Sequence, residues 1–304
     1  MIYTVTLNPA LDYVMKLDQL LPGGMNRAEK TQLLPGGKGI NVSLMLHNLG
    51  QSSVALGFLA GFTGQEIKRR LEEKSILTDF ILLREGSSRI NVKVKAEQET
   101  ELNADGPPIR EEEMAMLLEK LDRLKEGDYL VLAGSIPGTL PENLYEEIMS
   151  RLTGRGIRFV VDAEGEPLKR TLKHQPFLIK PNQTELEALC QSVPRTREEI
   201  AEAAGWLKAQ GAENVLVSLA GEGAVLLDAE GRLHDRRAVR GRAVNSVGAG
   251  DSMVAGFLAG LLECGDYEYA LRLGMSAGSA SAFSDELAAY GQVKKLMEEG
   301  YAGI

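Results

Sequence analysis

The stretch NSVGAGDSMVAG, residues 245–256, joins a glycine-rich turn to an acid and then to an apolar run with helical character. Three small residues, Gly248, Ala249 and Gly250, directly precede Asp251. The amino terminus of a helix has unpaired N–H groups and the positive end of the helix dipole, so it attracts anions. The stretch therefore predicts an anion site at a helix start, with Asp251 beside it. At this point a structural interpretation stays open, in which the glycines only make a turn and the acid only complements the dipole.

The rest of the chain alternates predicted strands with predicted helices. Apolar runs typical of strands lie at residues 2–7, 53–59, 129–134, 157–162, 177–181 and 214–219. A T-x-x-E capping box at Thr196 and Glu199 begins the helical segment 197–209. After residue 248 the helical segments are 250–263, 267–283 and 291–299. Continuous apolar strands interleaved with helices predict an α/β fold with a doubly wound, mostly parallel sheet flanked by helices. Ligands would bind at the carboxyl ends of its strands.

Two regions, residues 12–35 and 89–106, break this alternation. Both alternate polar and apolar residues between turn signals, which predicts short antiparallel strands. We expect them to form a small β-sheet lid, inserted twice into a single domain that spans residues 1–304. No linker, internal repeat or low-complexity tract divides the chain.

The segment RINVKVK, residues 89–95, has two distinct faces if it is a strand. A period of two places Arg89, Asn91, Lys93 and Lys95 on one face and Ile90, Val92 and Val94 on the other. A solvated face suffices to explain Lys93 and Lys95. A sheet of few strands exposes its apolar face unless something covers it. We therefore predict that the small sheet is a homodimer interface as well as a lid.

Two further motifs resemble the first in form. PGGKGIN, residues 35–41, places a second glycine cluster before a helix, but it is neither a Walker A loop nor a GxGxxG motif. In KPNQTEL, residues 180–186, Asn182 and Glu185 fit an N-x-x-E capping box. The same amide and carboxylate could instead organise a hydrated magnesium beside a nucleotide. Two glycine turns, each with charged or amide side chains nearby, predict two ligands that meet over the sheet.

The composition argues against several classes of function. The chain has 34 basic and 43 acidic residues and a net charge of −9, which disfavours nucleic acid or an anionic membrane as the main partner. None of its three histidines lies in an HExxH or paired arrangement, so a histidine-ligated metal is poorly supported. Its two cysteines form no CxxC, the amino terminus lacks a signal peptide, and the longest apolar run is too short to span a bilayer. We expect a cytoplasmic protein.

The motifs occur in the order seen in the ribokinase-like sugar kinases, which this chain resembles over essentially its whole length. They are TLNPALD near the amino terminus, PGGKGINV, RINVK, GSIP at 134–137, KPNQTEL, SLAGEGA at 218–224 and NSVGAGDSMVAG. The resemblance is to the phosphofructokinase B branch, and within it to kinases of fructose 1-phosphate. It implies a ribokinase-like fold. It also implies transfer of the γ-phosphoryl group of ATP, with Mg²⁺, to the 6-hydroxyl of D-fructose 1-phosphate.

The resemblance also implies roles for particular residues. Asp251 would be the general base, and the N–H groups of Gly248, Ala249 and Gly250 would stabilise charge on the transferred phosphoryl group. Because a helix amino terminus favours the carboxylate form, we expect Asp251 to be a weak base. The residues implied to bind the sugar phosphate are Asp12, Arg27, Gly36, Gly37, Lys38, Asn41, Arg89 and Ser135, with Arg27 and Arg89 meeting its phosphate.

Other matching positions belong to the nucleotide side of the site. They are Lys180, Asn182, Ser218, Gly221 and Gly223, with Glu185 near Mg²⁺ through water. A β-turn between strands explains SLAGEGA nearly as well. The contacts to adenine are not assigned, although Ser279 and Ser284 are candidates.

Two kinds of alternative function stay open. A kinase of the same branch could act on tagatose 6-phosphate or fructose 6-phosphate. A protein of another class, a non-catalytic regulator that binds a sugar or nucleotide, could use the same fold. The intact Asp251 and its glycine turn disfavour the regulator.

Overall fold

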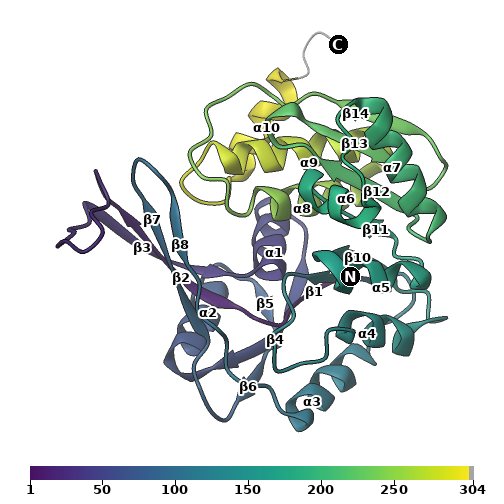
Figure 1. Cartoon of the computed structure of the whole chain (residues 1–304). Helices are drawn as coiled ribbons and strands as arrows, with labels where there is room; N and C mark the ends of the chain where they lie inside the picture. Colours follow the sequence, from purple (N-terminus) through teal and green to yellow (C-terminus); the bar gives the residue numbers. More distant parts are fainter. Residues whose placement is uncertain (301–304) are drawn as a thin grey trace.

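The computed structural model describes residues 1–300, which form two sheets with helices around the larger one (Figure 1). The strands of the larger sheet are β1 (Ile2–Thr6), β4 (Ser53–Ala60), β5 (Leu77–Thr78), β6 (Ile81–Leu83), β9 (Tyr129–Ala133), β10 (Arg158–Asp162), β11 (Leu178–Ile179), β12 (Asn214–Ser218), β13 (Ala224–Leu227) and β14 (Leu233–Arg236). Their order is β14-β13-β12-β11-β10-β9-β1-β4-β5, and β6 also pairs with β4. Only β12–β13 and β13–β14 are antiparallel among these pairs. The predicted mostly parallel sheet is therefore confirmed.

Helices cover both faces of this sheet. One face carries α3 (Glu111–Leu121), α4 (Leu144–Leu152), α5 (Gly165–Thr171), α6 (Gln183–Cys190) and α7 (Arg197–Ala209). The other carries α1 (Lys38–Asn48), α2 (Gly61–Glu73), α8 (Ala249–Cys264), α9 (Tyr267–Ala282) and α10 (Tyr290–Glu299). Along β9, Leu130 and Leu132 pack into the first layer, and Tyr129 and Val131 pack into the second. Apolar runs were continuous in the sequence because every central strand is buried on both sides.

Within residues 1–300, no helix combines the length and the apolar character that crossing a membrane requires.

The helix after the PGGKGIN motif begins earlier than predicted. Gly37 is the N-cap of α1 with a φ of 121°, so Lys38 and Asn41 lie in the first turn of the helix and not before it. A Cβ at Gly39 would lie 2.6 Å from Thr6 Oγ1. The glycines therefore let the start of the helix pack directly against the end of β1. This close packing places the first turn of α1 at the carboxyl edge of the sheet.

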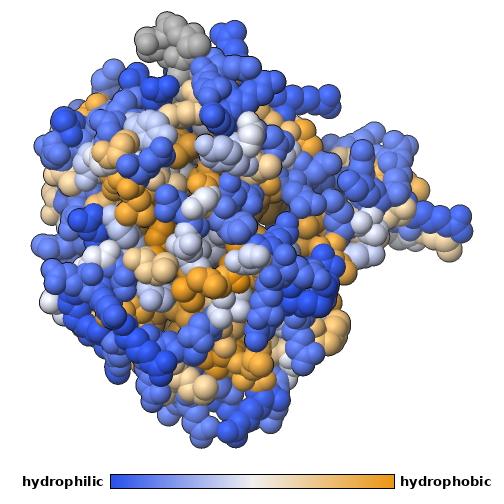
Figure 2. All heavy atoms as spheres, turned by 180° about the vertical axis from the view of Figure 1, so that it is seen from behind, coloured by the Kyte–Doolittle hydropathy of each residue, from blue (hydrophilic) through white to orange (hydrophobic). Residues whose placement is uncertain are grey.

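The second sheet has the order β3-β2-β7-β8. Its strands are β2 (Ala10–Lys16), β3 (Lys30–Gly36), β7 (Arg89–Lys95) and β8 (Thr100–Leu102). It projects as an arm from the main body, as Figures 1 and 2 both show. The expectation of antiparallel strands is correct within each inserted region but wrong between them, because β2 and β7 pair in parallel. Both strands enter the arm from the carboxyl edge of the main sheet, so they run in the same direction.

The polar face of β7 is largely buried, although the sequence predicted that solvent would reach it. Asn91 and Lys93 are buried, with 6% and 7% of their surface exposed, whereas Ile90 is 40% exposed. The expectation that a solvated face explains Lys93 is therefore wrong. The arm leans over the edge of the main sheet with its polar face inward. As a result, part of its apolar face is left uncovered in the single chain.

Candidate active site

A cavity of about 1050 Å³ lies at the carboxyl edge of the main sheet, under the arm. The loops after β1, β9, β10, β11 and β12 line it, together with the first turns of α1 and α8 and the polar face of β7. This is the edge where ligands bind in open α/β sheets. The structure thus brings the three motifs PGGKGIN, KPNQTEL and NSVGAGDS around one space.

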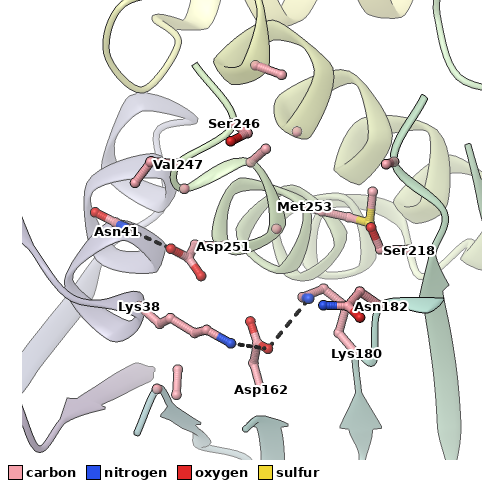
Figure 3. A pocket seen from close by; sticks show the side chains of 18 of the residues that line it. Lys38, Asn41, Asp162, Lys180, Asn182, Ser218, Ser246, Val247, Asp251 and Met253 are labelled. Atoms are coloured by element: carbon pink, nitrogen blue, oxygen red, sulfur yellow. Dashed lines mark hydrogen bonds and ion pairs between the residues drawn. The ribbon is translucent and has the colours of Figure 1, made fainter. Parts of the chain in front are cut away.

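Asp251 lies in the first turn of α8 and contacts the first turn of α1. Gly248 is the N-cap of α8 with a φ of 77°, in the left-handed region that glycine adopts readily. Asp251 is 5% exposed, and Asn41 Nδ2 donates a hydrogen bond of 2.7 Å to its Oδ2 (Figure 3). The Ala249 N–H already donates to Ser246 O at 3.3 Å, so one of the three predicted anion donors has an internal partner. The two glycine turns meet at this acid.

The environment of Asp251 makes it a stronger base than we expected. Burial raises its pKa, the nearby Asp162 raises it further, and Asn41 and the two lysines Lys38 and Lys180 lower it again, giving a pKa of about 6. The weak-base expectation was drawn from the helix dipole alone. Removal from water and a second anion outweigh the dipole here.

Asp162, which the motif analysis did not assign, is the central carboxylate of the cavity. It ends β10, is 1% exposed, and lies between two lysines (Figure 3). Lys38 Nζ lies 3.2 Å and Lys180 Nζ 3.5 Å from the same oxygen, Oδ1. Its other oxygen, Oδ2, is buried and has no hydrogen-bond partner. The sequence did contain a signal, because IRFVVD ends a buried strand with an acid at the ligand-binding edge.

The two lysines reach Asp162 from opposite sides. Lys38 comes from the first turn of α1, and Lys180 directly follows β11. Burial alone would lower the pKa of Lys38, but the carboxylates Asp162, Asp251 and Glu185 raise it above its usual value. Lys38 is therefore a firmly charged cation in the cavity.

Asn182 and Glu185 form the predicted capping box of α6. Asn182 Oδ1 accepts the Glu185 N–H at 2.8 Å, and Glu185 Oε2 accepts the Asn182 N–H at 2.8 Å. Both residues also line the cavity. Burial raises the pKa of Glu185, although the Asn182 N–H and the lysines oppose this shift. The structural interpretation of this motif is confirmed, and it leaves the Glu185 carboxylate at the cavity wall.

At the other end of the cavity, residues of the arm surround Asp12. Asn91 Nδ2 donates to Asp12 Oδ1 at 3.1 Å, and Lys93 Nζ lies 3.5 Å from Oδ2. A Cβ at Gly36 would lie 2.5 Å from the same oxygen, so Gly36 makes room for the carboxylate and does not itself line the cavity. Arg89 lines the cavity beside them, and its Nε donates to Asn8 O at 3.2 Å. Burial lowers the pKa of Arg89.

The remaining predicted residues divide into two groups. Gly37, Ser135, Ser218, Gly221 and Ser279 line the cavity. Arg27, Gly223 and Ser284 are absent from its lining. Arg27 is exposed in the loop between β2 and β3, and Ser284 donates to Ala280 O. SLAGEGA is the turn between β12 and β13, as its structural interpretation required.

The cavity also includes residues that no motif indicated. The segment between β14 and α8 contributes Val239 and Arg240, and Phe283 directly follows α9. The apolar side chains of Val239 and Phe283 suit the flat face of an aromatic ligand. Residues of this kind carry no local sequence signal, because they come from irregular segments outside the helices and strands.

The chemistry of the cavity suits a magnesium ion that is held mainly by phosphate and water. Within the described residues, no group of three or more His, Cys, Asp or Glu side chains could hold a metal. Mg²⁺ commonly keeps several waters and binds through one or two carboxylates and substrate phosphates. Glu185 is one of the carboxylates at the cavity wall that could lie beside such a hydrated ion.

The chain matches known proteins over nearly its whole length. Residues 5–289 match the pfkB family of carbohydrate kinases. The chain is 46% identical over 299 residues to the 1-phosphofructokinase of Bacillus subtilis strain 168, covering 98% of each. It is 38% identical to a D-tagatose-1-phosphate kinase of Bacillus licheniformis, covering 97% of this chain and 96% of the relative. A solved structure of phosphofructokinase-2 from Escherichia coli with substrates and products has a TM-score of 0.93 at 30% identity, over 97% of this chain and 98% of that one.

Proposed function

Because this chain belongs to the pfkB family of carbohydrate kinases, it is a sugar kinase, and we propose that it phosphorylates D-fructose 1-phosphate with ATP. The product would be fructose 1,6-bisphosphate. The observation that carries this proposal is the contact between Asp251 and Asn41, which joins an acid, a helix amino terminus and a second glycine turn in one cavity. The name of the Bacillus subtilis relative supports the choice of sugar.

In the proposed reaction, Asp251 accepts the proton of the sugar 6-hydroxyl. The hydroxyl oxygen forms a bond to the γ-phosphorus, and the bond from that phosphorus to the bridging oxygen breaks, releasing ADP. The amino terminus of α8, with Gly248 and Gly250, stabilises the charge on the transferred group. A base with a pKa of about 6 is ionised near neutral pH and can still take a proton late in a loose transition state.

The cations of the cavity are placed for two phosphate groups. Lys180 Nζ lies 3.2 Å from the position of a Cβ at Gly250, next to the turn where the γ-phosphoryl group would bind. Arg89 lies at the sugar end with Asp12. We assign Asp12 to the sugar hydroxyls and Arg89 to the existing phosphate. Arg27 lies away from the cavity of its own chain, so it would reach a substrate phosphate only after movement of the arm or from another subunit.

The nucleotide would occupy the side lined by Ser218 and Gly221. Asn182 and Glu185 lie between it and the sugar side. Mg²⁺, held by the ATP phosphates and by water next to Glu185, would neutralise phosphate charge. Lys180 would contact the phosphates from the end of β11.

We also propose that the arm is a lid on a single kinase domain and a contact between two subunits. Ile90 and Leu102 are 40% and 60% exposed on one face of the arm, and Val92, directly opposite Leu102, lies on that face. Burying such a face stabilises a small sheet that is marginal alone. Closing the polar face over the sugar would exclude water and limit ATP hydrolysis.

The alternative substrates are phosphates of tagatose. A relative named for D-tagatose 1-phosphate is 38% identical, so identity alone separates the two sugars weakly. Tagatose 6-phosphate and fructose 6-phosphate are further candidates within the family.

A panel of sugar phosphates with ATP and Mg²⁺, monitored by ADP release, tests the proposal. We expect the highest kcat/KM for fructose 1-phosphate and poor turnover of free fructose, which would leave Arg89 without its anion. A clear preference for a tagatose phosphate would overturn the proposed sugar substrate but not the proposed kinase reaction. No turnover of any member would overturn the proposed function.

A further inference from the structure

The ion pairs of Asp162 are unusual for a purely structural contact. A buried ion pair is commonly stabilised when both partners satisfy their hydrogen-bonding atoms, because removing charge from water is costly. Here both lysines lie near Oδ1 alone, while Oδ2 is buried without a partner. Asp162 thus meets two cations with one oxygen and leaves the trio with a net positive charge.

The positions of the two lysines relate this charge to the reacting atoms. Lys38 lies in the first turn of α1, three residues before Asn41, which contacts Asp251. Lys180 lies beside Gly250 in the turn that begins α8. Figure 3 shows Asp162 between the two lysines and below Asp251. Lys38 therefore lies beside Asn41 and Asp251. Lys180 lies beside the glycine turn where the proposed function places the γ-phosphoryl group.

We propose that Asp162 is a positioning residue that holds the ammonium groups of Lys38 and Lys180 together beside the path of the transferred phosphoryl group. This inference rests on the proposed function. Two ammonium groups in one cavity repel each other, and a shared carboxylate between them offsets that repulsion. Without it, the lysines would separate, and the charge that forms on the phosphoryl group in the transition state would lose its nearest cations.

Asp162→Asn tests the proposal, because it keeps the size of the side chain and removes the charge. We expect kcat to fall about tenfold or more while the KM values of ATP and sugar phosphate change less than about threefold, since the loss falls on the transition state. Glu164→Gln is the matched control: Glu164 also lies near Lys38, at 3.8 Å, but it is 72% exposed and does not contact Lys180. It should keep near-normal kcat. A loss confined to the KM of the sugar, or no loss, would overturn the proposal.

Double variants test whether Asp162 acts by holding the two lysines together, as a tether, or only supports the fold. If Asp162 acts through the lysines, Lys38→Met should reduce kcat less in the Asp162→Asn background than in the wild type. Additive losses would contradict the tether. If Asp162→Asn fails to fold, the pair Lys38→Met and Lys180→Met replaces it. These lysines meet at Asp162, so non-additive losses would support a shared tether and additive ones would overturn it.

The pH profile gives a readout that a merely structural role would not move. Asp251 is faced by Asn41 and Lys38 from α1, by Asp162 from β10 and by Lys180 after β11. Asp162 raises the pKa of Asp251 and the two lysines lower it, so removing the charge of Asp162 and releasing the lysines should shift the acid limb of kcat/KM, whereas Glu164→Gln should leave the limb in place. An unmoved limb would count against the proposal. All variants are compared on the sugar phosphate that the wild type prefers, so a different substrate overturns only the proposed function.

Discussion

Removing the amide of Asn41 should shift the acid limb of the pH–rate profile, where the rate falls at low pH, to higher pH. Asn41 Nδ2 donates to Asp251 Oδ2 at 2.7 Å and lowers the pKa of Asp251. A hydrogen bond to a charged group contributes about 1.5–3 kcal/mol, and one pKa unit corresponds to about 1.4 kcal/mol. In Asn41→Leu the carboxylate loses this donor, so its pKa should rise by about one to two units. The midpoint of the acid limb should therefore move from about 6 to about 7 or 8.

The assay is kcat/KM for the sugar phosphate between pH 5 and 9, with ADP release coupled to a second enzyme that is checked at each pH. The position of the limb does not depend on the absolute rate, so a raised KM in the variant does not obscure it. Asn48→Leu is the control on the same helix, because Asn48 Nδ2 donates to a backbone carbonyl, Ala288 O, at 2.9 Å. A midpoint that is unchanged or lower in Asn41→Leu would refute the assignment of the acid limb to Asp251.

Four further variants test the site and the arm. Asp251→Asn should keep nucleotide binding by calorimetry while lowering kcat by about 100-fold or more, and near-normal turnover would remove Asp251 from its role as base. Arg89→Ala should raise the KM of the sugar phosphate by about tenfold or more with little change for ATP, and an equal rise for both would contradict its assignment to the substrate phosphate. Gly36→Ala, whose Cβ would lie 2.5 Å from Asp12 Oδ2, should weaken sugar binding and leave nucleotide affinity intact in the same titrations. Ile90→Asp should shift sedimentation at micromolar concentration from dimer to monomer, and an all-monomeric wild type would refute the interface.

The sequence predicted those parts of the fold that have local causes. The capping boxes at Thr196 and Asn182 begin helices as their spacing requires. The helix 197–209 has the predicted bounds. Glycine turns indicated where α1 and α8 start, because their backbones need φ values that other residues adopt with strain.

The orientation of the arm had no such local cause. Alternation along β7 separates two faces but does not say which one is covered. The position of the arm over the cavity buries Asn91 and Lys93 and leaves Ile90 exposed. The parallel pairing of β2 with β7 likewise depends on how two distant segments leave the main sheet. Long-range packing determined both features.

The pKa of Asp251 could not be predicted from the sequence either, because the larger effects on it come from distant segments. From the sequence, the helix amino terminus was the visible influence on Asp251, and a dipole stabilises a charge there by about 0.3–1 kcal/mol, less than one pKa unit. Burial and a second carboxylate can shift a pKa by several units. Asp251 becomes buried only when α1 packs against α8, and it meets Asp162 only because β10 ends at the same edge. Asp162 lies 89 residues and Asn41 lies 210 residues from Asp251 in the chain. Asn41 lowers the pKa of Asp251, whereas burial and Asp162 raise it. The pKa of Asp251 is therefore a property of the assembled edge of the sheet, and a variant that loosens the packing of α1 should change this pKa without altering the carboxylate itself.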